Sequence, residues 1–85
     1  MPSATVHVRY WAAARAATGV DREAVTVGDA CASVGDVLDE VSGRHTGLAR
    51  VLAVASVLVD GRVADQECAL TEGMVIEVLP PFAGG

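Results

Sequence analysis

The chain ends with three segments that decide its fold: Met74-Val75-Ile76-Glu77-Val78-Leu79, then Pro80-Pro81, then Phe82-Ala83-Gly84-Gly85. The first segment is apolar except at Glu77, and such a β-rich run is typical of a strand inside a sheet. The two prolines cannot donate sheet hydrogen bonds and have a fixed φ, so the strand ends before them. We therefore predict a last strand over 74–79 and an extended C-terminal tail over 80–85.

The N-terminal part of the chain predicts a strand, a short helix and a second strand. Residues 5–10 alternate between polar and apolar side chains, which is the pattern of a half-buried strand. The Ala-rich residues 11–18 favour a helix, and Gly19 stands where a left-handed cap is common. Residues 23–27 are rich in β-formers and precede a Gly-Asp turn signal, so they predict a strand that returns beside the first.

The middle of the chain carries the clearest helix signal. Ser33 and Asp36 have the spacing of a capping box. Apolar residues follow at i, i+3, i+4 and i+7, namely Val34, Val37, Leu38 and Val41. We expect Gly43 to end this helix. Residues 48–54 fit either a helical turn or an irregular crossover, and their pattern does not decide between the two.

A hairpin precedes the last strand. Asp60-Gly61 supplies the positive φ values of a tight turn, so residues 57–59 and 62–63 are predicted to pair. Residues 71–73 form another turn signal. The complete order predicts an α+β fold, with a mixed sheet of four to five strands wrapped on one main helix and short additional helices. Residues 1–85 form a single domain in this interpretation.

Composition limits the possible partners. The net charge is −5, from 11 acidic residues and six arginines, which argues against nucleic acid because phosphate binding needs clustered positive charge. The apolar stretch at 48–59 is shorter than the roughly 20 residues that cross a membrane. The first ten residues lack the features of a secretory signal, so we expect a cytoplasmic protein without a membrane partner.

Cysteine and histidine do not predict a metal site or a catalytic set. Cys31 and Cys68 are far apart in the sequence and are expected to be free thiols, at least partly buried, whose roles stay open. His7 and His45 have no second ligand at metal spacing and are expected at the surface. Asp60 is explained by its turn.

The sequence resembles the small subunit of molybdopterin synthase, in the MoaD/ThiS group of sulfur carriers. The resemblance rests on residues 59–61, 70–73 and 79–85, with weaker similarity at 8–12 and 33–41. The chain departs from the family pattern at Ala69-Leu70, which lacks the family's common lysine, and at Phe82, where many members carry Val or Thr.

The resemblance implies a ubiquitin-like β-grasp fold in which the first and last strands are parallel neighbours at the sheet centre. It also implies a non-catalytic subunit that binds no cofactor. An adenylyltransferase of the MoeB type would use ATP to adenylylate Gly85, and a sulfur donor would convert it to a thiocarboxylate. A larger, catalytic subunit of the MoaE type, in a two-plus-two heterotetramer, would use that sulfur for the dithiolene of molybdenum cofactor.

The tail suits this chemistry. Gly84 and Gly85 lack a Cβ, so together with Ala83 they could enter a narrow channel of a partner enzyme. Residues 80–85 can reach roughly 20 Å at about 3.3 Å per residue. The candidate docking residues are Leu58, Val59, Leu79, Pro80, Pro81 and Phe82. Of Leu58 and Val59, we expect one in the core and the other at the surface.

Other functions remain open at this point. The sulfur could instead serve thiamine, cysteine or tRNA thiolation, because these routes use the same Gly-Gly chemistry. A ubiquitin-like modifier would join Gly85 to target lysines, and a domain that only binds would not need Gly84 or Gly85. Glycine-rich ends are also commonly frayed termini without a role.

Overall fold

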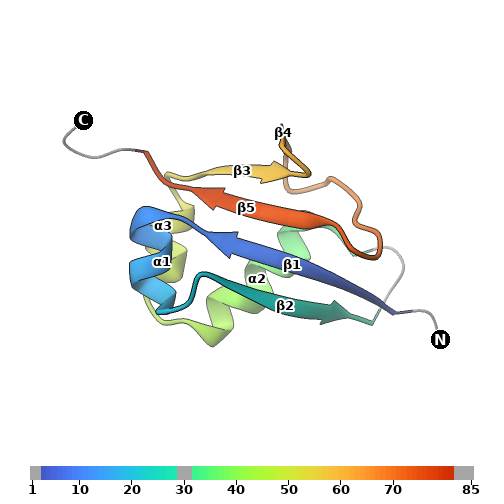
Figure 1. Ribbon diagram of the computed structural model, residues 1–85, viewed down its shortest axis with the longest axis horizontal. Helices are drawn as coiled ribbons and strands as arrows, with labels where there is room; N and C mark the ends of the chain where they lie inside the picture. The colour runs from blue at the N-terminus through green and yellow to red at the C-terminus, as the bar shows by residue number, and fades with distance from the viewer. Residues whose placement is uncertain (1–2, 29–31, 82–85) are drawn as a thin grey trace.

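The structure is a computed structural model that describes residues 3–28 and 32–81. Its strands are β1 (Ala4–Tyr10), β2 (Arg22–Val27), β3 (Ser56–Val59), β4 (Arg62–Val63) and β5 (Val75–Leu79), and its helices are α1 (Ala12–Thr18), α2 (Val34–Arg44) and α3 (Leu48–Leu52). The strands form one mixed sheet in the order β2-β1-β5-β3-β4 (Figure 1). The predicted α+β arrangement is confirmed.

The last strand lies at the centre of this sheet, as its apolar sequence predicts. β5 pairs with β1 in parallel, with Val8 opposite Ile76 and Tyr10 opposite Val78, and with β3 in the antiparallel direction. Ile76 and Val78 are fully buried, whereas Glu77 between them lies on the opposite face and is partly exposed. The chain therefore leaves the sheet from its middle rather than from an edge.

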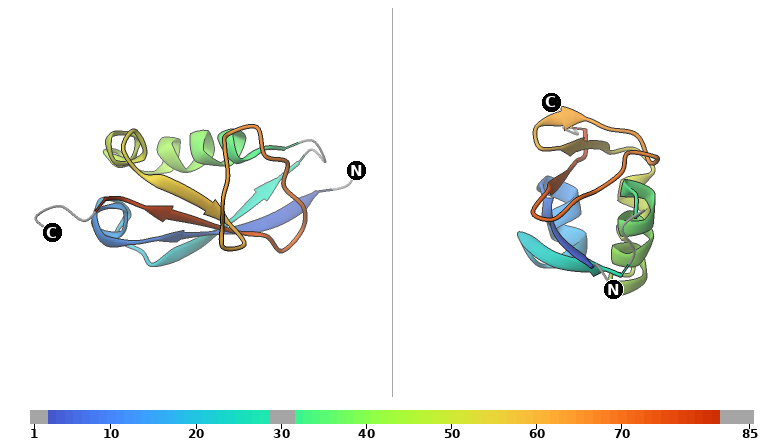
Figure 2. Two further views of the ribbon diagram at one scale, coloured as in Figure 1. Left: turned by 90° about the horizontal axis from the view of Figure 1, so that it is seen from above. Right: turned by 90° about the vertical axis from the view of Figure 1, so that its right-hand side faces the viewer.

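One face of the sheet packs on α2, which lies across it, while α1 and α3 contact each other at one end (Figure 2). The buried core joins the apolar stripe of α2 to the inward residues of the strands. Its fully buried side chains are Val6, Val8, Ala14, Val25, Val34, Val37, Val41, Leu48, Ile76 and Val78. The core is almost entirely aliphatic, and among the described residues Tyr10 is its one aromatic member.

The start of α2 confirms the predicted capping box. The Ser33 hydroxyl accepts the Asp36 amide N–H at 3.3 Å, and the Asp36 carboxylate accepts the Ser33 amide N–H at 3.0 Å. The predicted end at Gly43 is wrong, because the helix continues to Arg44 and has His45 at its C-cap. Arg44 and His45 both contact Glu23 of β2, and these tertiary contacts hold the last turn in place.

The turns follow the sequence signals. Asp60 and Gly61 have φ values of 49° and 85°, so the β3–β4 hairpin turns as predicted. Asp60 does more than turn the chain, because its carboxylate accepts the amide N–H of Val75 at 3.0 Å and so ties the hairpin to β5. Residues 48–52 form a helix, which decides the alternative that the sequence left open. Within residues 3–28 and 32–81, none of the helices combines the length and apolar character that a membrane span requires.

Candidate functional site: the root of the tail and the outer sheet face

The tail begins at the end of β5, beside α1 and α3 (Figure 1). Leu79 is half-buried and pairs with Ser56 of β3, Pro80 is buried, and Pro81 is exposed. The amide N–H of Trp11 donates to the carbonyl of Val78 at 3.2 Å, which holds the start of α1 against this end of β5. The described part of the tail is therefore anchored up to Pro80.

Four predicted site residues, Phe82, Ala83, Gly84 and Gly85, lie outside the described residues. Their predicted roles are docking for Phe82, passage through a partner's channel for Ala83 and Gly84, and thiocarboxylate formation for Gly85. These roles stay predictions. The structure describes the strand and the prolines that lead to them.

The sheet face opposite α2 carries a row of side chains that crosses four strands. Strand register places Arg9 of β1 beside Glu77 of β5, Glu77 beside Leu58 of β3, and Leu58 beside Val63 of β4. Neighbours in one row lie on the same face of a sheet. Val63 is 80% exposed, and Leu58 is half-buried. We call Arg9, Glu77, Leu58 and Val63 the outer row.

The structure separates the two docking candidates of the β3–β4 hairpin, Leu58 and Val59, because only Leu58 belongs to the outer row. Val59 is 7% exposed and packs in the core opposite Ile76, whereas Leu58 lies on the outer face. Val59 therefore lies on the core side of β3 and outside the outer row, because alternate residues of a strand face opposite sides. The expectation that one of the two belongs to the core and the other to the surface is confirmed.

Trp11 extends the outer row toward the tail. Trp11 is 39% exposed, and its indole N–H donates to Oε2 of Glu77 at 3.1 Å. The guanidinium carbon of Arg9 lies 4.6 Å from the ring centroid, within the range of a cation–π contact, and Arg9 Nη1 is 3.9 Å from the same carboxylate oxygen. These contacts hold an exposed aromatic ring in one orientation before any partner binds.

Sequence reasoning did not select Arg9, Trp11 or Val63 as docking residues. A signal was present, because residues 5, 7 and 9 occupy the face of β1 opposite the core residues Val6, Val8 and Tyr10. The proximity of Trp11 and Arg9 to Glu77, however, depends on the pairing of strands more than 60 positions apart.

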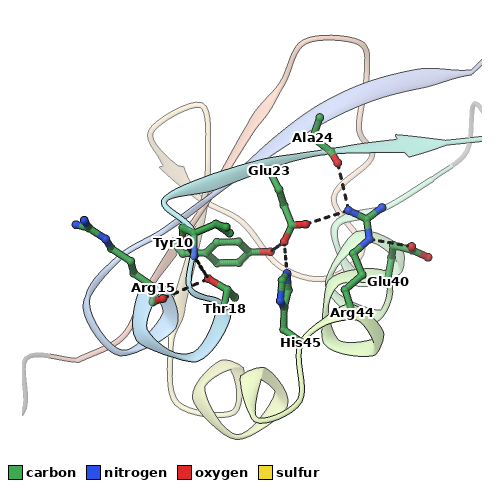
Figure 3. Close-up of polar contacts among 9 residues, drawn as sticks. Tyr10, Arg15, Thr18, Glu23, Ala24, Glu40, Arg44 and His45 are labelled. Atoms are coloured by element: carbon green, nitrogen blue, oxygen red, sulfur yellow. Dashed lines mark hydrogen bonds and ion pairs between the residues drawn. The ribbon is translucent and has the colours of Figure 1, made fainter.

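A second polar cluster lies on the side of the sheet that faces α2 (Figure 3). Glu23 of β2 accepts the Tyr10 hydroxyl at 2.5 Å, contacts His45 Nε2 at 2.6 Å, and accepts Arg44 Nη1 at 3.0 Å. The Glu23 and His45 side chains are each 18% exposed. His45 is therefore not a free surface residue, because its ring fastens the end of α2 to the sheet.

This environment changes two pKa values in opposite directions. Partial burial raises the pKa of Glu23, but the hydrogen bonds from Tyr10, His45 and Arg44 outweigh it and hold that pKa below its usual value. Burial, followed by the hydrogen bond and charge of Glu23, raises the pKa of Tyr10. Glu23 is thus stabilised as a carboxylate and Tyr10 as a neutral phenol.

Cys68 is a free thiol of intermediate burial whose sulfur lies 3.6 Å from the carbonyl oxygen of Ala69. This agrees with the expectation of a partly buried free thiol. Cys31 lies outside the described residues.

Three solved structures resemble this chain over nearly its whole length. SAMP1 from Haloferax volcanii is 29% identical, with a TM-score of 0.86 over 95% of this chain and 99% of that one. A putative molybdopterin converting factor, subunit 1, from Pyrococcus furiosus is 29% identical, with a TM-score of 0.83 over 92% and 98% of the two chains. The third comes from a complex of subunits 1 and 2 of the molybdopterin-converting factor of Helicobacter pylori; it is 22% identical, with a TM-score of 0.69 over 95% and 99%. No curated protein sequence matches the chain significantly.

The sheet order, the helix on one face and these neighbours define a ubiquitin-like β-grasp protein. The chain belongs to the ThiS family, whose model matches residues 8–85. It is thus a small sulfur carrier of the ThiS/MoaD type, a class that is generally non-catalytic. This confirms the family and the fold that the sequence resemblance implies.

Proposed function

We propose that this chain is the sulfur-carrier subunit of a molybdopterin synthase and that Gly85 carries the sulfur as a C-terminal thiocarboxylate. The observation that carries the proposal is the place where β5 ends: the central strand stops at Leu79, beside Trp11 and the outer row, and the sequence continues directly into the tail at 80–85. The domain can dock through a rigid face while the tail that follows Pro81 is presented to the partner's reacting groups.

The tail requires activation by a partner because a carboxylate is a poor acyl electrophile. In the proposed sequence, an adenylyltransferase joins the Gly85 carboxylate to AMP from ATP, with release of pyrophosphate. A sulfide equivalent from a sulfur donor then displaces AMP and leaves the thiocarboxylate. A difficult substitution is thereby divided into two easier steps. The chain itself binds no cofactor in this proposal.

Two of the neighbours support the molybdopterin assignment. The Pyrococcus furiosus protein carries a molybdopterin-converting name, and the Helicobacter pylori structure contains a second subunit. We infer a larger catalytic subunit as the partner that receives the sulfur. A two-plus-two assembly would supply two sulfurs for one dithiolene. The preordered ring of Trp11 and the exposed Val63 suit a surface that becomes buried on binding.

The first test is intact-mass analysis after incubation with ATP, a sulfur donor and the adenylyltransferase of the same organism. We expect the mass to rise by the difference between sulfur and oxygen in the full chain and to stay unchanged in a variant that lacks Gly85. The charged protein is then mixed with the large subunit and the pterin precursor. Formation of the dithiolene would assign the chain to molybdopterin synthesis. If the chain is loaded with sulfur but no dithiolene forms, the sulfur goes to another acceptor.

A second candidate is a ubiquitin-like modifier that is joined to lysines of other proteins. The resemblance to the small archaeal modifier protein SAMP1 favours this candidate. The chain contains no lysine, so it could modify other proteins but could not itself accept a side-chain isopeptide bond. Stable conjugates of higher mass in a cell extract, lost when Gly85 is removed, would establish this function.

A further inference from the structure

A groove lies between the edge strand β2 and the first half of α2, on the side of the sheet away from β3 and β4. Its volume is about 310 Å³. It is lined by Val25, Thr26, Val27, Gly28, Ala32, Asp36 and Glu40. The groove contains none of the outer-row residues and none of the described tail, so the proposed sulfur transfer does not account for it.

The backbone of β2 offers hydrogen-bonding groups along this groove. Among the described residues, β2 has β1 as its one strand partner, and the Tyr10 amide N–H donates to the Asp21 carbonyl at 2.8 Å. Because antiparallel partners alternate between bonded and non-bonded pairs, Ala24 and Thr26 turn their N–H and C=O groups away from β1. Arg44 donates to the Ala24 carbonyl at 3.3 Å (Figure 3). Among residues 3–28 and 32–81, nothing bonds the outward backbone groups of Thr26.

The groove has a negative wall and an apolar floor. The wall consists of Asp36 and Glu40, both exposed on α2, and the floor includes the half-buried Val27 and the buried Ala32. Oδ2 of Asp36 accepts the Ser33 amide, and Oε2 of Glu40 pairs with Arg44 Nε at 3.2 Å. The other oxygen of each carboxylate bonds to no residue that the structure describes. None of the described residues that line the groove has a cationic side chain.

We propose that an extended peptide segment of a partner protein binds here by adding a strand to the edge of β2. The outward N–H and C=O of Thr26 would pair with the backbone of the segment. On the side that faces α2, the segment carries an apolar residue over Val27 and Ala32. A lysine or arginine two positions away meets Glu40 or Asp36, since alternate residues of a strand face the same side. Beyond the Ala24 carbonyl, which Arg44 occupies, residues 25–28 offer about 14 Å of backbone, which matches a segment of about four residues.

The charge of the chain selects this occupant over a second copy of the protein. At a net charge of −5, two copies repel each other, and the carboxylate wall would meet another acidic surface. A basic segment gains attraction along the same wall. The binding does not require Gly85, so it is independent of the proposed sulfur chemistry.

The test uses the full chain labelled with ¹⁵N and the capped peptide Thr-Arg-Thr-Val-Thr-Arg-Thr, whose symmetric sequence serves either strand direction. We expect saturable shifts of the Ala24, Thr26 and Gly28 amide signals. A peptide with glutamate in place of arginine, and one with N-methylated backbone amides, should not bind. Thr26→Pro should abolish binding, because it removes an outward N–H at a sheet edge, where proline is tolerated.

A matched pair of charge variants keeps the test valid if Thr26→Pro fails to fold. Glu40→Gln should weaken binding about threefold, the effect of one exposed ion pair, whereas Asp39→Asn on the same helix should leave it unchanged. Asp39 does not line the groove. The proposal is overturned if no shift saturates, if both charge variants weaken binding equally, or if the β2 signals shift with protein concentration alone, which would indicate self-association.

Discussion

The indole N–H of Trp11 donates to Oε2 of Glu77 at 3.1 Å, although the two residues lie 66 positions apart in the chain. Arg9 closes the cluster by lying over the Trp11 ring. A ring held in this way loses little further freedom when a partner covers it, so most of its contact area contributes to binding. The cluster lies beside the strand that leads into the tail, so a partner that docked on it would position the tail for the proposed reaction.

Trp11→Ala should weaken binding to the adenylyltransferase and to the large subunit by about tenfold, the cost of truncating a central aromatic anchor. Titration calorimetry with each partner measures this change. Trp11→Phe keeps a ring but loses the hydrogen bond to Glu77. Its affinity for each partner should lie between that of the original chain and that of Trp11→Ala. Unchanged affinity in Trp11→Ala, with unfolding like that of the original chain, would exclude the outer row from docking.

Gly84→Val should abolish sulfur loading while the free energy of unfolding stays the same. A branched side chain next to Gly85 would obstruct a narrow channel and hinder the approach of ATP to the carboxylate. Intact-mass analysis follows loading, and urea denaturation follows stability. Ala83→Gly serves as the control, because it makes the tail smaller and should still load. Full loading of the valine variant would show that the channel tolerates a side chain there.

Acid should destabilise the protein partly through Glu23. Its pKa is lower in the folded chain than the unfolded value of 4.5, so its contribution is present above pH 4.5 and is lost as the pH falls through the folded value. Urea denaturation between about pH 3 and pH 7, the range in which carboxylates titrate, measures how steeply the free energy of unfolding falls with pH. Glu23→Gln should be less stable at neutral pH and should show a smaller loss on acidification. An unchanged slope would contradict this role.

Alkali should destabilise the protein through Tyr10. Its pKa is raised in the folded chain above the unfolded value of 10.0, so its contribution is present below pH 10 and is lost as the pH rises beyond it. Ultraviolet absorbance of the phenolate should show that Tyr10 ionises only when the protein unfolds. Tyr10→Phe should remove this loss of stability at alkaline pH. It should also lower the free energy of unfolding by about 1 kcal/mol at neutral pH, because Glu23 loses a hydrogen bond.

Two glycines should respond to alanine in opposite ways. Gly61→Ala should lower the free energy of unfolding by about 1 kcal/mol or more, because Gly61 has a φ of 85°. Gly43→Ala should raise it by about 0.5–1 kcal/mol, because Gly43 lies inside α2 and a Cβ there meets no atom within 4 Å. Urea denaturation of both variants tests the pair. A destabilised Gly43→Ala would show that Gly43 acts as a helix terminator after all.

Local signals were sufficient for most elements. The capping box at Ser33, the Asp60-Gly61 turn and the apolar run of β5 were predicted because each depends on residues within a few positions of one another. The end of α2 was misplaced at Gly43 because Glu23, more than 20 positions away, binds both Arg44 and His45. The sequence of α2 alone contains no information on the contact of Arg44 and His45 with Glu23.

The sequence by itself determined the α+β class, the order of elements, and the tail that ends in Gly84-Gly85, because these depend on propensity, periodicity and the chemistry of single residues. Tertiary structure alone decided which side chains share a surface. The pairing of β1 with β5 and of β5 with β3 brings Arg9, Glu77 and Leu58 into one row, and the packing of α2 on the sheet fastens His45 to Glu23. Such contacts follow from strand register and helix packing between distant segments, which no local pattern specifies.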